Sequence, residues 1–159
     1  MSPYPELISR LYKAFGARDH EAMARCYSPE AHFSDPVFPD LQGSQIAGMW
    51  RMLCERATDL RIAFDSVAAK GDAGSAHWEA WYTYSATGRP VHNVIEARFD
   101  FRDELIVRHV DSFDLYAWSR QALGIRGILL GWAPPVQAAV RRQAQKALAR
   151  HLALTGAGR

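Results

Sequence analysis

The sequence predicts an α+β fold, with helices first and antiparallel strands after them. Before about residue 58, apolar residues recur at spacings of three and four, which is typical of amphipathic helices. Between about residues 60 and 113 they alternate with polar residues, as in half-buried strands joined by short turns. Because the two kinds of segment are separated along the chain, the pattern favours α+β over alternating α/β.

Three helices are expected in the first part of the chain. The first covers residues 5–17, with a proline in its first turn. Asp19 is placed to cap a short second helix, and Ser44 to open a third that closes near residue 58. Their apolar positions are Leu7, Ile8, Leu11, Tyr12 and Phe15, then Met23, Cys26 and Tyr27, then Ile46, Met49, Trp50 and Leu53. Each stripe needs a sheet to cover.

Four strands are expected, at residues 60–64, 77–85, 91–101 and 105–113, and the last two form a hairpin. A three-residue loop would place Phe101 opposite Leu105, whereas a two-residue loop would set Phe99 against Arg108. We expect the three-residue loop, since it keeps apolar residues of both strands on one face. Ala97 then lies opposite His109, and Ile95 opposite Asp111.

Asp111 and His109 are candidate functional residues because they point into an otherwise apolar face. A carboxylate facing a core is costly unless it has a partner, and such groups cluster at functional sites. The alternative is structural: the two side chains only satisfy one another. Asp35, held extended by Pro36, either caps a turn or presents a semi-buried carboxylate at a pocket mouth.

Composition restricts the partners and the compartment. With 159 residues the chain is expected to be one domain, and a net charge of +2 with scattered acidic residues argues against nucleic acid. Cys26 and Cys54 are expected to be buried thiols. No secretory signal or membrane-length apolar run is visible, so we expect a cytoplasmic protein without a membrane partner. No nucleotide motif or metal-ligand cluster is present, and we expect no cofactor and no metal.

The tail carries an apolar segment, Gly124 to Trp132, followed by a basic amphipathic helix from Pro134. We expect the segment to cover a pocket mouth as a lid, or alternatively to complete the core as a fixed strap. The helix is expected to dock on its own domain rather than on a membrane.

The outer face of the predicted sheet suggests a homodimer. It carries Trp81, Ile106 and Val110 beside charges that can pair across a two-fold axis. Those charged or titratable neighbours are His77, Glu79, Glu96 and Arg98.

The order of elements, the "D-P" turn at Asp35 and the ending "R-H-V-D-S-F-D-L" resemble the SnoaL-like branch of the nuclear transport factor 2-like superfamily. Ketosteroid isomerase and limonene-1,2-epoxide hydrolase are neighbouring branches. The resemblance implies a cone-shaped fold over residues 1–118, in which three helices and a curved antiparallel or mixed sheet enclose a pocket, with residues 119–159 as an extension packed on it. The pocket is expected to be lined by Phe15, Phe33, Trp50, Trp78, Tyr82, Asn93, Phe99 and Phe113.

Asp35 falls where the isomerases keep a proton-shuttling aspartate, but Leu11 and Ala97 stand where their oxyanion donors would be. Asp111 matches the catalytic aspartate of the epoxide hydrolases, yet Trp78 and Ala80 replace its arginine and aspartate partners. The SnoaL cyclases close a polyketide ring with an aspartate and no cofactor. Of the three families they need the fewest catalytic groups, and Asp111 resembles their aspartate.

We therefore expect the protein to bind a small hydrophobic molecule, polyketide-, steroid- or terpenoid-like, and to carry out cofactor-free isomerase- or cyclase-type acid/base chemistry on it. Asp111 would be the principal acid or base, His109 would tune it, and Asp35 would be a second carboxylate. If both carboxylates face one pocket, their mutual repulsion should hold one proton near neutrality. The alternatives are a non-catalytic ligand-binding or dimerisation module, an epoxide hydrolase-like enzyme, and a partner-protein adaptor.

Overall fold

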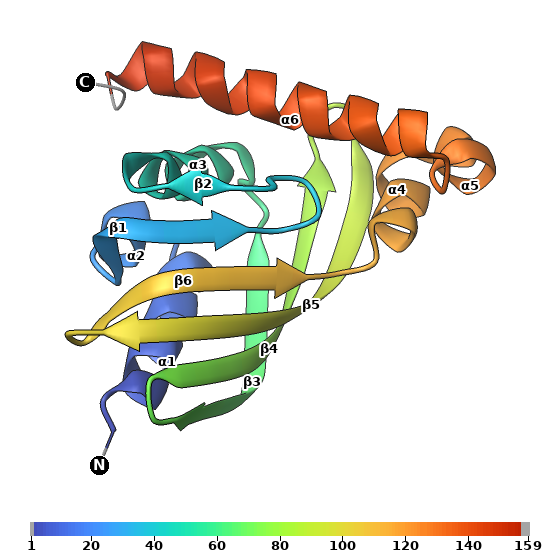
Figure 1. Cartoon of the computed structure of the whole chain (residues 1–159). Helices are drawn as coiled ribbons and strands as arrows, with labels where there is room; N and C mark the ends of the chain where they lie inside the picture. Colours follow the sequence, from blue (N-terminus) through green and yellow to red (C-terminus); the bar gives the residue numbers. More distant parts are fainter. Residues whose placement is uncertain (1, 157–159) are drawn as a thin grey trace.

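The computed structural model describes residues 2–156 and has the predicted α+β architecture. A strongly curved sheet is covered by helices on its concave side, and a long C-terminal helix crosses one end (Figure 1). The elements are α1 (Tyr4–Gly16), α2 (His20–Ala24), β1 (Tyr27–Ser34), β2 (Leu41–Gln42), α3 (Ser44–Arg56), β3 (Arg61–Lys70), β4 (Ala73–Tyr84), β5 (Arg89–Arg102), β6 (Leu105–Ser112), α4 (Leu115–Leu123), α5 (Ile125–Leu130) and α6 (Pro134–Thr155).

The sheet has six strands in the order β2-β1-β6-β5-β4-β3, all antiparallel except the pair β1 and β6. The helical assignment of Tyr27 was wrong, because α2 ends at Ala24 and Tyr27 begins β1. Tyr27 pairs with Ile106 and Phe33 with His109. This pairing joins segments about 80 residues apart in sequence, so local patterns carry no signal of it.

The register of the β5–β6 hairpin differs from the prediction. The loop has two residues, Asp103 and Glu104, both with positive φ (53° and 62°), as two-residue hairpin turns require. An irregularity between Asp100 and Phe101 then shifts the pairing by one residue. As a result Phe99 lies opposite His109 and Ala97 opposite Asp111.

One residue that the prediction placed on the outer face of the sheet, Ile106, lies inside the protein. Ile106 is fully buried, with its amide donating to the Cys26 carbonyl (2.9 Å), and so cannot contribute to an exposed dimer surface. His109 and Asp111 nevertheless point inward, as predicted, because the bulge restores the shared face of the odd-numbered residues.

The helices use the predicted stripes. In α1 the residues Leu7, Ile8 and Leu11 are at most 1% exposed, and the Asp19 carboxylate accepts the Ala22 amide at 3.0 Å to cap α2. Cys26 and Cys54 are buried free thiols. Within residues 2–156, no helix combines the length and apolarity needed to cross a bilayer.

The C-terminal helix α6 lies across α3. Leu148 is buried there, His151 Nε2 lies 3.0 Å from a Glu55 carboxylate oxygen, and Arg141 Nε donates to the Pro36 carbonyl at 2.8 Å. The buried Leu148 and these two polar contacts fix α6 on the domain.

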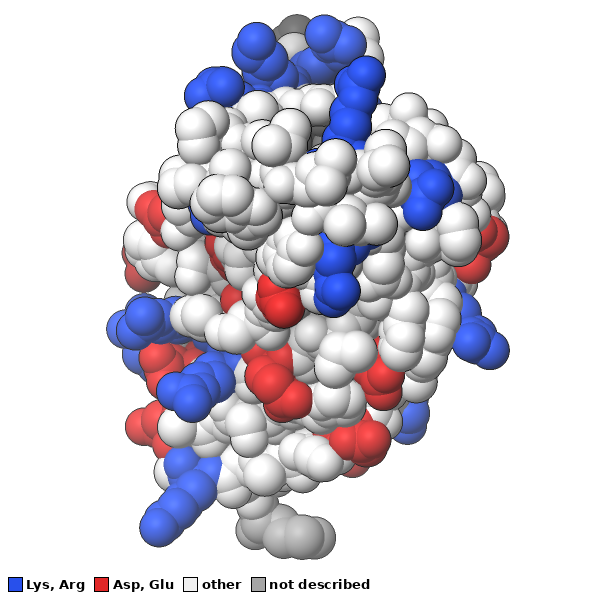
Figure 2. All heavy atoms as spheres, turned by 90° about the vertical axis from the view of Figure 1, so that its right-hand side faces the viewer, with Lys and Arg blue, Asp and Glu red and all other residues white. Residues whose placement is uncertain are grey.

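The expected role of the segment from Gly124 to Trp132 was wrong. Its large side chains are exposed and line no part of the pocket, so the segment is neither a lid nor a strap. It packs through glycine instead: a Cβ at Gly127 would lie 1.9 Å from the Ser119 carbonyl oxygen of α4. Figure 2 shows this end of the molecule as a broad uncharged area next to Lys and Arg side chains.

Candidate functional site

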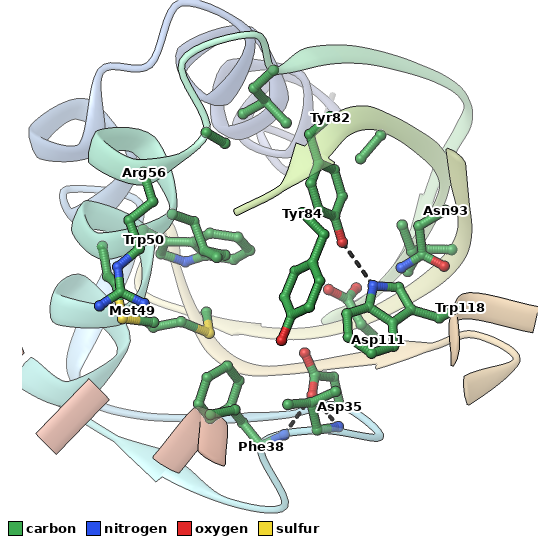
Figure 3. Close-up of a pocket in the computed structure, with 18 of the residues that line it drawn as sticks. Asp35, Phe38, Met49, Trp50, Arg56, Tyr82, Tyr84, Asn93, Asp111 and Trp118 are labelled. Carbon is green, nitrogen blue, oxygen red and sulfur yellow. Dashed lines mark hydrogen bonds between the residues drawn. The ribbon is translucent and has the colours of Figure 1, made fainter. Parts of the chain in front are cut away.

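A cavity of about 260 Å³ lies between the concave face of the sheet, α3 and α6 (Figure 3). Most of its wall is aromatic or aliphatic, with a few polar groups, which is the usual form of a small-molecule site. The residues around it include Phe15, Phe33, Asp35, Val37, Phe38, Met49, Trp50, Leu53, Arg56, Trp78, Tyr82, Tyr84, Asn93, Ile95, Asp111, Phe113, Trp118, Val140, Gln143, Ala144 and Ala147.

Most of the sequence-predicted site residues lie on this wall. They are Phe15, Phe33, Trp50, Trp78, Tyr82, Asn93, Phe113, Asp35 and Asp111. Phe99 and His109 do not reach the cavity. They pack on each other behind it, with ring centroids 4.4 Å apart, and His109 has no exposed surface.

A chain of buried hydrogen bonds runs from α3 to the cavity through β1 and β6. Trp50 Nε1 donates to the Tyr27 hydroxyl (3.1 Å), which lies 2.8 Å from His109 Nδ1, and His109 Nε2 lies 2.8 Å from Asp111 Oδ1. Both nitrogens of His109 are therefore engaged. The chain fixes the imidazole and, through it, the Asp111 carboxylate.

One arrangement of protons satisfies every donor in this chain. The Tyr27 oxygen already accepts from Trp50, so its own proton is donated to Nδ1 of His109, which leaves the Nε2 proton for Asp111. Burial, and then the nearby Asp111, raise the pKa of Tyr27 well above its usual value, so the phenol keeps this proton. His109 is thus a positioning residue for Asp111.

Asp111 presents one oxygen to the protein and one to the cavity. Its Oδ1 accepts from His109 and, at 3.3 Å, from Trp78 Nε1. Within residues 2–156, Oδ2 accepts no hydrogen bond, although the carboxyl group lines the cavity. An unengaged carboxylate oxygen at an apolar wall can accept a proton from a bound molecule.

Asp35 fulfils both of the roles considered for it. Its Oδ1 accepts the amides of Val37 (2.7 Å) and Phe38 (2.6 Å), which caps the turn, and the carboxyl group also lines the cavity. Burial raises the pKa of Asp35 to about 7, and the negative charge of Asp111 adds to the rise, against the lowering effect of the two amides. Burial outweighs the repulsion between carboxylates on which the sequence argument rested.

The raised pKa of Asp35 predicts a pH-dependent stability. From about pH 4 to pH 7 the folded protein holds a proton that the unfolded chain releases, so stability falls as pH rises through this range. Asp35→Asn keeps the Oδ1 acceptor but removes the titration. We expect the variant to be more stable than the wild type by roughly 4 kcal/mol above pH 7, and nearly equal to it near pH 4. Urea unfolding across this range measures the difference, and parallel pH profiles for the two proteins would contradict it.

Tyr82 supplies a donor that the sequence argument did not identify. Its hydroxyl oxygen accepts from Trp118 Nε1 at 2.8 Å, which leaves the phenolic proton available for a bound molecule, and the residue lines the cavity (Figure 3). Burial raises the pKa of Tyr82 to about 12, so the group stays protonated at neutral pH. Asn93 lies on the same side of the cavity.

The cavity includes parts that sequence patterns did not indicate. Trp118 of α4 was expected on a short helix, but nothing placed it beside Tyr82. Val140 and Ala144 of α6 close the cavity, although the apolar stripe of this helix is rich in alanine and weak. Small residues suit this place, because α6 must lie close to the cavity without filling it.

Solved structures share this fold at low sequence identity. A protein with a ketosteroid isomerase-like fold from Catenulispora acidiphila, in complex with trimethylamine, is 16% identical and has a TM-score of 0.68, covering 82% of this chain and 98% of its own. IdmH from Streptomyces antibioticus, a candidate polyketide cyclase, is 22% identical with a TM-score of 0.63, over 76% of this chain and 97% of its own.

An epoxide hydrolase of M. tuberculosis, similar to limonene-1,2-epoxide hydrolase, is 16% identical with a TM-score of 0.63, covering 78% of this chain and 90% of its own. A comparison with curated proteins finds no match. The sequence itself matches the SnoaL-like domain over residues 8–109, which is more than half of the chain and runs from within α1 to within β6. The chain therefore belongs to the SnoaL-like domain family.

Proposed function

We propose that the protein binds a small hydrophobic carbonyl compound in the cavity and catalyses proton transfer on it without a cofactor, as an isomerase or cyclase. The observation that carries the proposal is the unengaged Asp111 Oδ2, held at an apolar wall by His109 and Trp78. A carboxylate so oriented is a competent general base.

In the proposed step, Asp111 removes a proton from the carbon next to the ligand carbonyl. The C–H bond breaks, the proton passes to Asp111 Oδ2, and the electron pair forms an enolate. The Tyr82 hydroxyl donates to the enolate oxygen and stabilises its charge. In a cyclisation the enolate carbon then bonds to a second carbonyl carbon of the same molecule, whose oxygen takes up a proton. In an isomerisation, Asp111 returns the proton to another carbon.

Asp35 is placed to supply or take up the second proton. A carboxyl group with a pKa of about 7 exchanges protons readily at neutral pH, and Asp35 lies on the same cavity wall. Leu11 and Ala97 stand where the isomerases have hydrogen-bond donors to the enolate oxygen, and neither side chain can donate. In the proposed mechanism the Tyr82 hydroxyl takes over that role. An epoxide hydrolase mechanism has less support, because Trp78 offers Asp111 an uncharged N–H in place of arginine.

The test uses β-tetralone, a small bicyclic ketone with acidic protons beside its carbonyl, dissolved in heavy water. Proton magnetic resonance follows the replacement of those protons by deuterium. The proposal predicts exchange faster than in buffer and saturation with ketone concentration. Tyr82→Phe should reduce the rate while leaving binding, measured by quenching of cavity tryptophans, nearly unchanged. Binding without faster exchange across a set of such ketones would favour a ligand-binding module instead.

We also propose that the protein forms a homodimer through the outer face of the sheet. With Ile106 buried, the apolar part of this face consists of Trp81, Val110 and Val94, which is 47% exposed. The Trp81 ring stacks on His92 at 4.5 Å and has the Arg61 guanidinium 4.5 Å from its centroid, so it is held rigidly. A rigid aromatic among pairable charges is suited to a self-complementary interface.

Trp81→Glu is expected to convert the dimer into a monomer, because it places a charge at the centre of the apolar contact. Sedimentation equilibrium at micromolar concentration measures the mass. The matched control is Lys70→Glu, at the far end of β3, which should leave the mass unchanged. A wild-type protein that is already monomeric would overturn this proposal.

A further inference from the structure

The segment from Ile125 to Trp132, here called the α5 knob, is the largest concentration of exposed apolar side chains in residues 2–156. Ile125 is 72% exposed, Ile128 51%, Leu129 62%, Leu130 51% and Trp132 64%. Isolated exposed apolar residues are common, but a contiguous group of this kind marks an interaction surface.

Specific contacts with α4 and α6 hold the knob in its position. Gly127 and Gly131 form its inner side, where a Cβ would lie within 3 Å of Ser119 atoms, so larger residues can only face outward. The Tyr116 hydroxyl donates to the Ile128 carbonyl (2.9 Å) and Gln137 to the Gly131 carbonyl (3.0 Å). These contacts with α4 and α6 hold the apolar side chains away from the domain.

The part of the chain that forms the knob and follows it carries charge of one sign. No aspartate or glutamate follows Asp114 in the sequence, whereas Arg120 and Arg126 lie within or next to the knob. Along α6 the basic side chains continue with Arg141, Arg142, Lys146 and Arg150. Figure 2 shows Lys and Arg at the edges of the uncharged area and most of the Asp and Glu side chains farther down.

We propose that the α5 knob inserts into the surface of an anionic phospholipid membrane, with Arg120, Arg126 and the basic residues in the N-terminal half of α6 contacting the headgroups. Aliphatic side chains with a tryptophan enter the interfacial layer, and nearby basic residues add attraction to anionic lipid. The apolar side chains of the knob carry no hydrogen-bonding groups apart from the Trp132 N–H, which is satisfied by the Leu129 carbonyl at 3.0 Å. The apolar interior of a lipid layer offers no hydrogen-bond partners, so an apolar surface without such groups is suited to it.

A membrane fits better than a second copy of the chain. A two-fold contact through the knob would bring two segments of the same positive charge together, which opposes association. The proposal also replaces the expectation of no membrane partner, and it does not depend on the chemistry proposed for the cavity. Since α4 and α6 both line the cavity, docking would place its wall close to the lipid surface.

The test is co-sedimentation with phosphatidylcholine vesicles prepared with and without phosphatidylglycerol. The wild type should pellet with the anionic vesicles, less with neutral ones, and less again at high salt. The double variant Ile125→Ser/Leu129→Ser should bind the anionic vesicles at least about tenfold more weakly. Leu154→Ser is the matched control: Leu154 is 81% exposed but lies at the other end of α6, so its loss should not change binding.

Tryptophan fluorescence gives an independent readout. Trp50, Trp78 and Trp118 are buried, and Trp81 lies on the outer face of the sheet between His92 and Arg61, so a blue shift on adding anionic vesicles should come from Trp132 and be absent in Trp132→Phe. Failure to bind anionic vesicles, or equal binding by the double variant, would overturn the proposal. So would a vesicle-independent oligomer that the double variant abolishes, since the occupant would then be a second copy. Unchanged circular dichroism in the variants excludes a folding defect.

Discussion

Asp111→Asn is expected to lower the rate of deuterium exchange into β-tetralone by at least about 100-fold, because general acid/base groups contribute factors of this size or larger. Asparagine has nearly the same shape as aspartate and keeps an oxygen at the Oδ1 position. It can still accept the hydrogen bonds of His109 and Trp78. What it loses is the ability to take up a proton at the second position, which faces the cavity.

The matched control is Asp114→Asn, three residues away. Asp114 caps α4 through the Ala117 amide (3.0 Å) and lies outside the cavity, and asparagine caps helices equally well. Exchange by this variant should equal that of the wild type. The experiment requires that Asp111→Asn still binds the ketone and melts within a few degrees of the wild type. Unchanged exchange under those conditions would exclude Asp111 as the base, and Asp35→Asn would then test the other carboxyl group.

The periodicity of the sequence was sufficient to predict which face of β4 and β5 is buried, but it could not predict the pairing between strands. Alternation in β4 and β5 correctly separates Trp78 and Ala80 from Glu79 and Trp81. The hairpin register depends on an extra residue in β6, Val107, opposite the step from Asp100 to Phe101, and on a turn of two non-glycine residues with positive φ, and neither has a sequence signature here. The predicted register was therefore wrong although the predicted face was right.

Long-range contacts limited the prediction of the site in the same way. Asp111 and Asp35 stand out locally, one as a carboxylate in an apolar face and the other before a proline. Tyr27 completes the hydrogen-bond chain from 82 residues away, and Trp118 orients Tyr82 from 36 residues away. The prediction for the α5 knob failed for a physical reason. Apolar residues usually pack inward, but here the glycines face the domain and the large apolar side chains between them face outward.

His109→Ala is expected to destabilise the fold by about 3–5 kcal/mol, which for a chain of this size lowers the melting temperature by roughly 10 °C. His109 is fully buried and contacts the rings of Tyr27, Phe33 and Phe99. Alanine would leave a cavity among those rings. It would also leave the Tyr27 O–H without its acceptor and Asp111 Oδ1 with only the longer hydrogen bond from Trp78, inside the protein, where unpaired polar groups are costly.

Two further substitutions distinguish packing from hydrogen bonding. His92→Ala removes an exposed histidine that also lies close to a carboxylate, Glu79 at 2.7 Å, and should cost less than about 1 kcal/mol because solvent screens the pair. His109→Phe keeps a ring in place but cannot bond Tyr27 or Asp111. If the hydrogen-bond chain contributes as argued, phenylalanine recovers only part of the stability that alanine loses. Urea unfolding measures all three variants. Full recovery by phenylalanine would mean that His109 is retained for its bonding to Asp111 rather than for the stability of the fold.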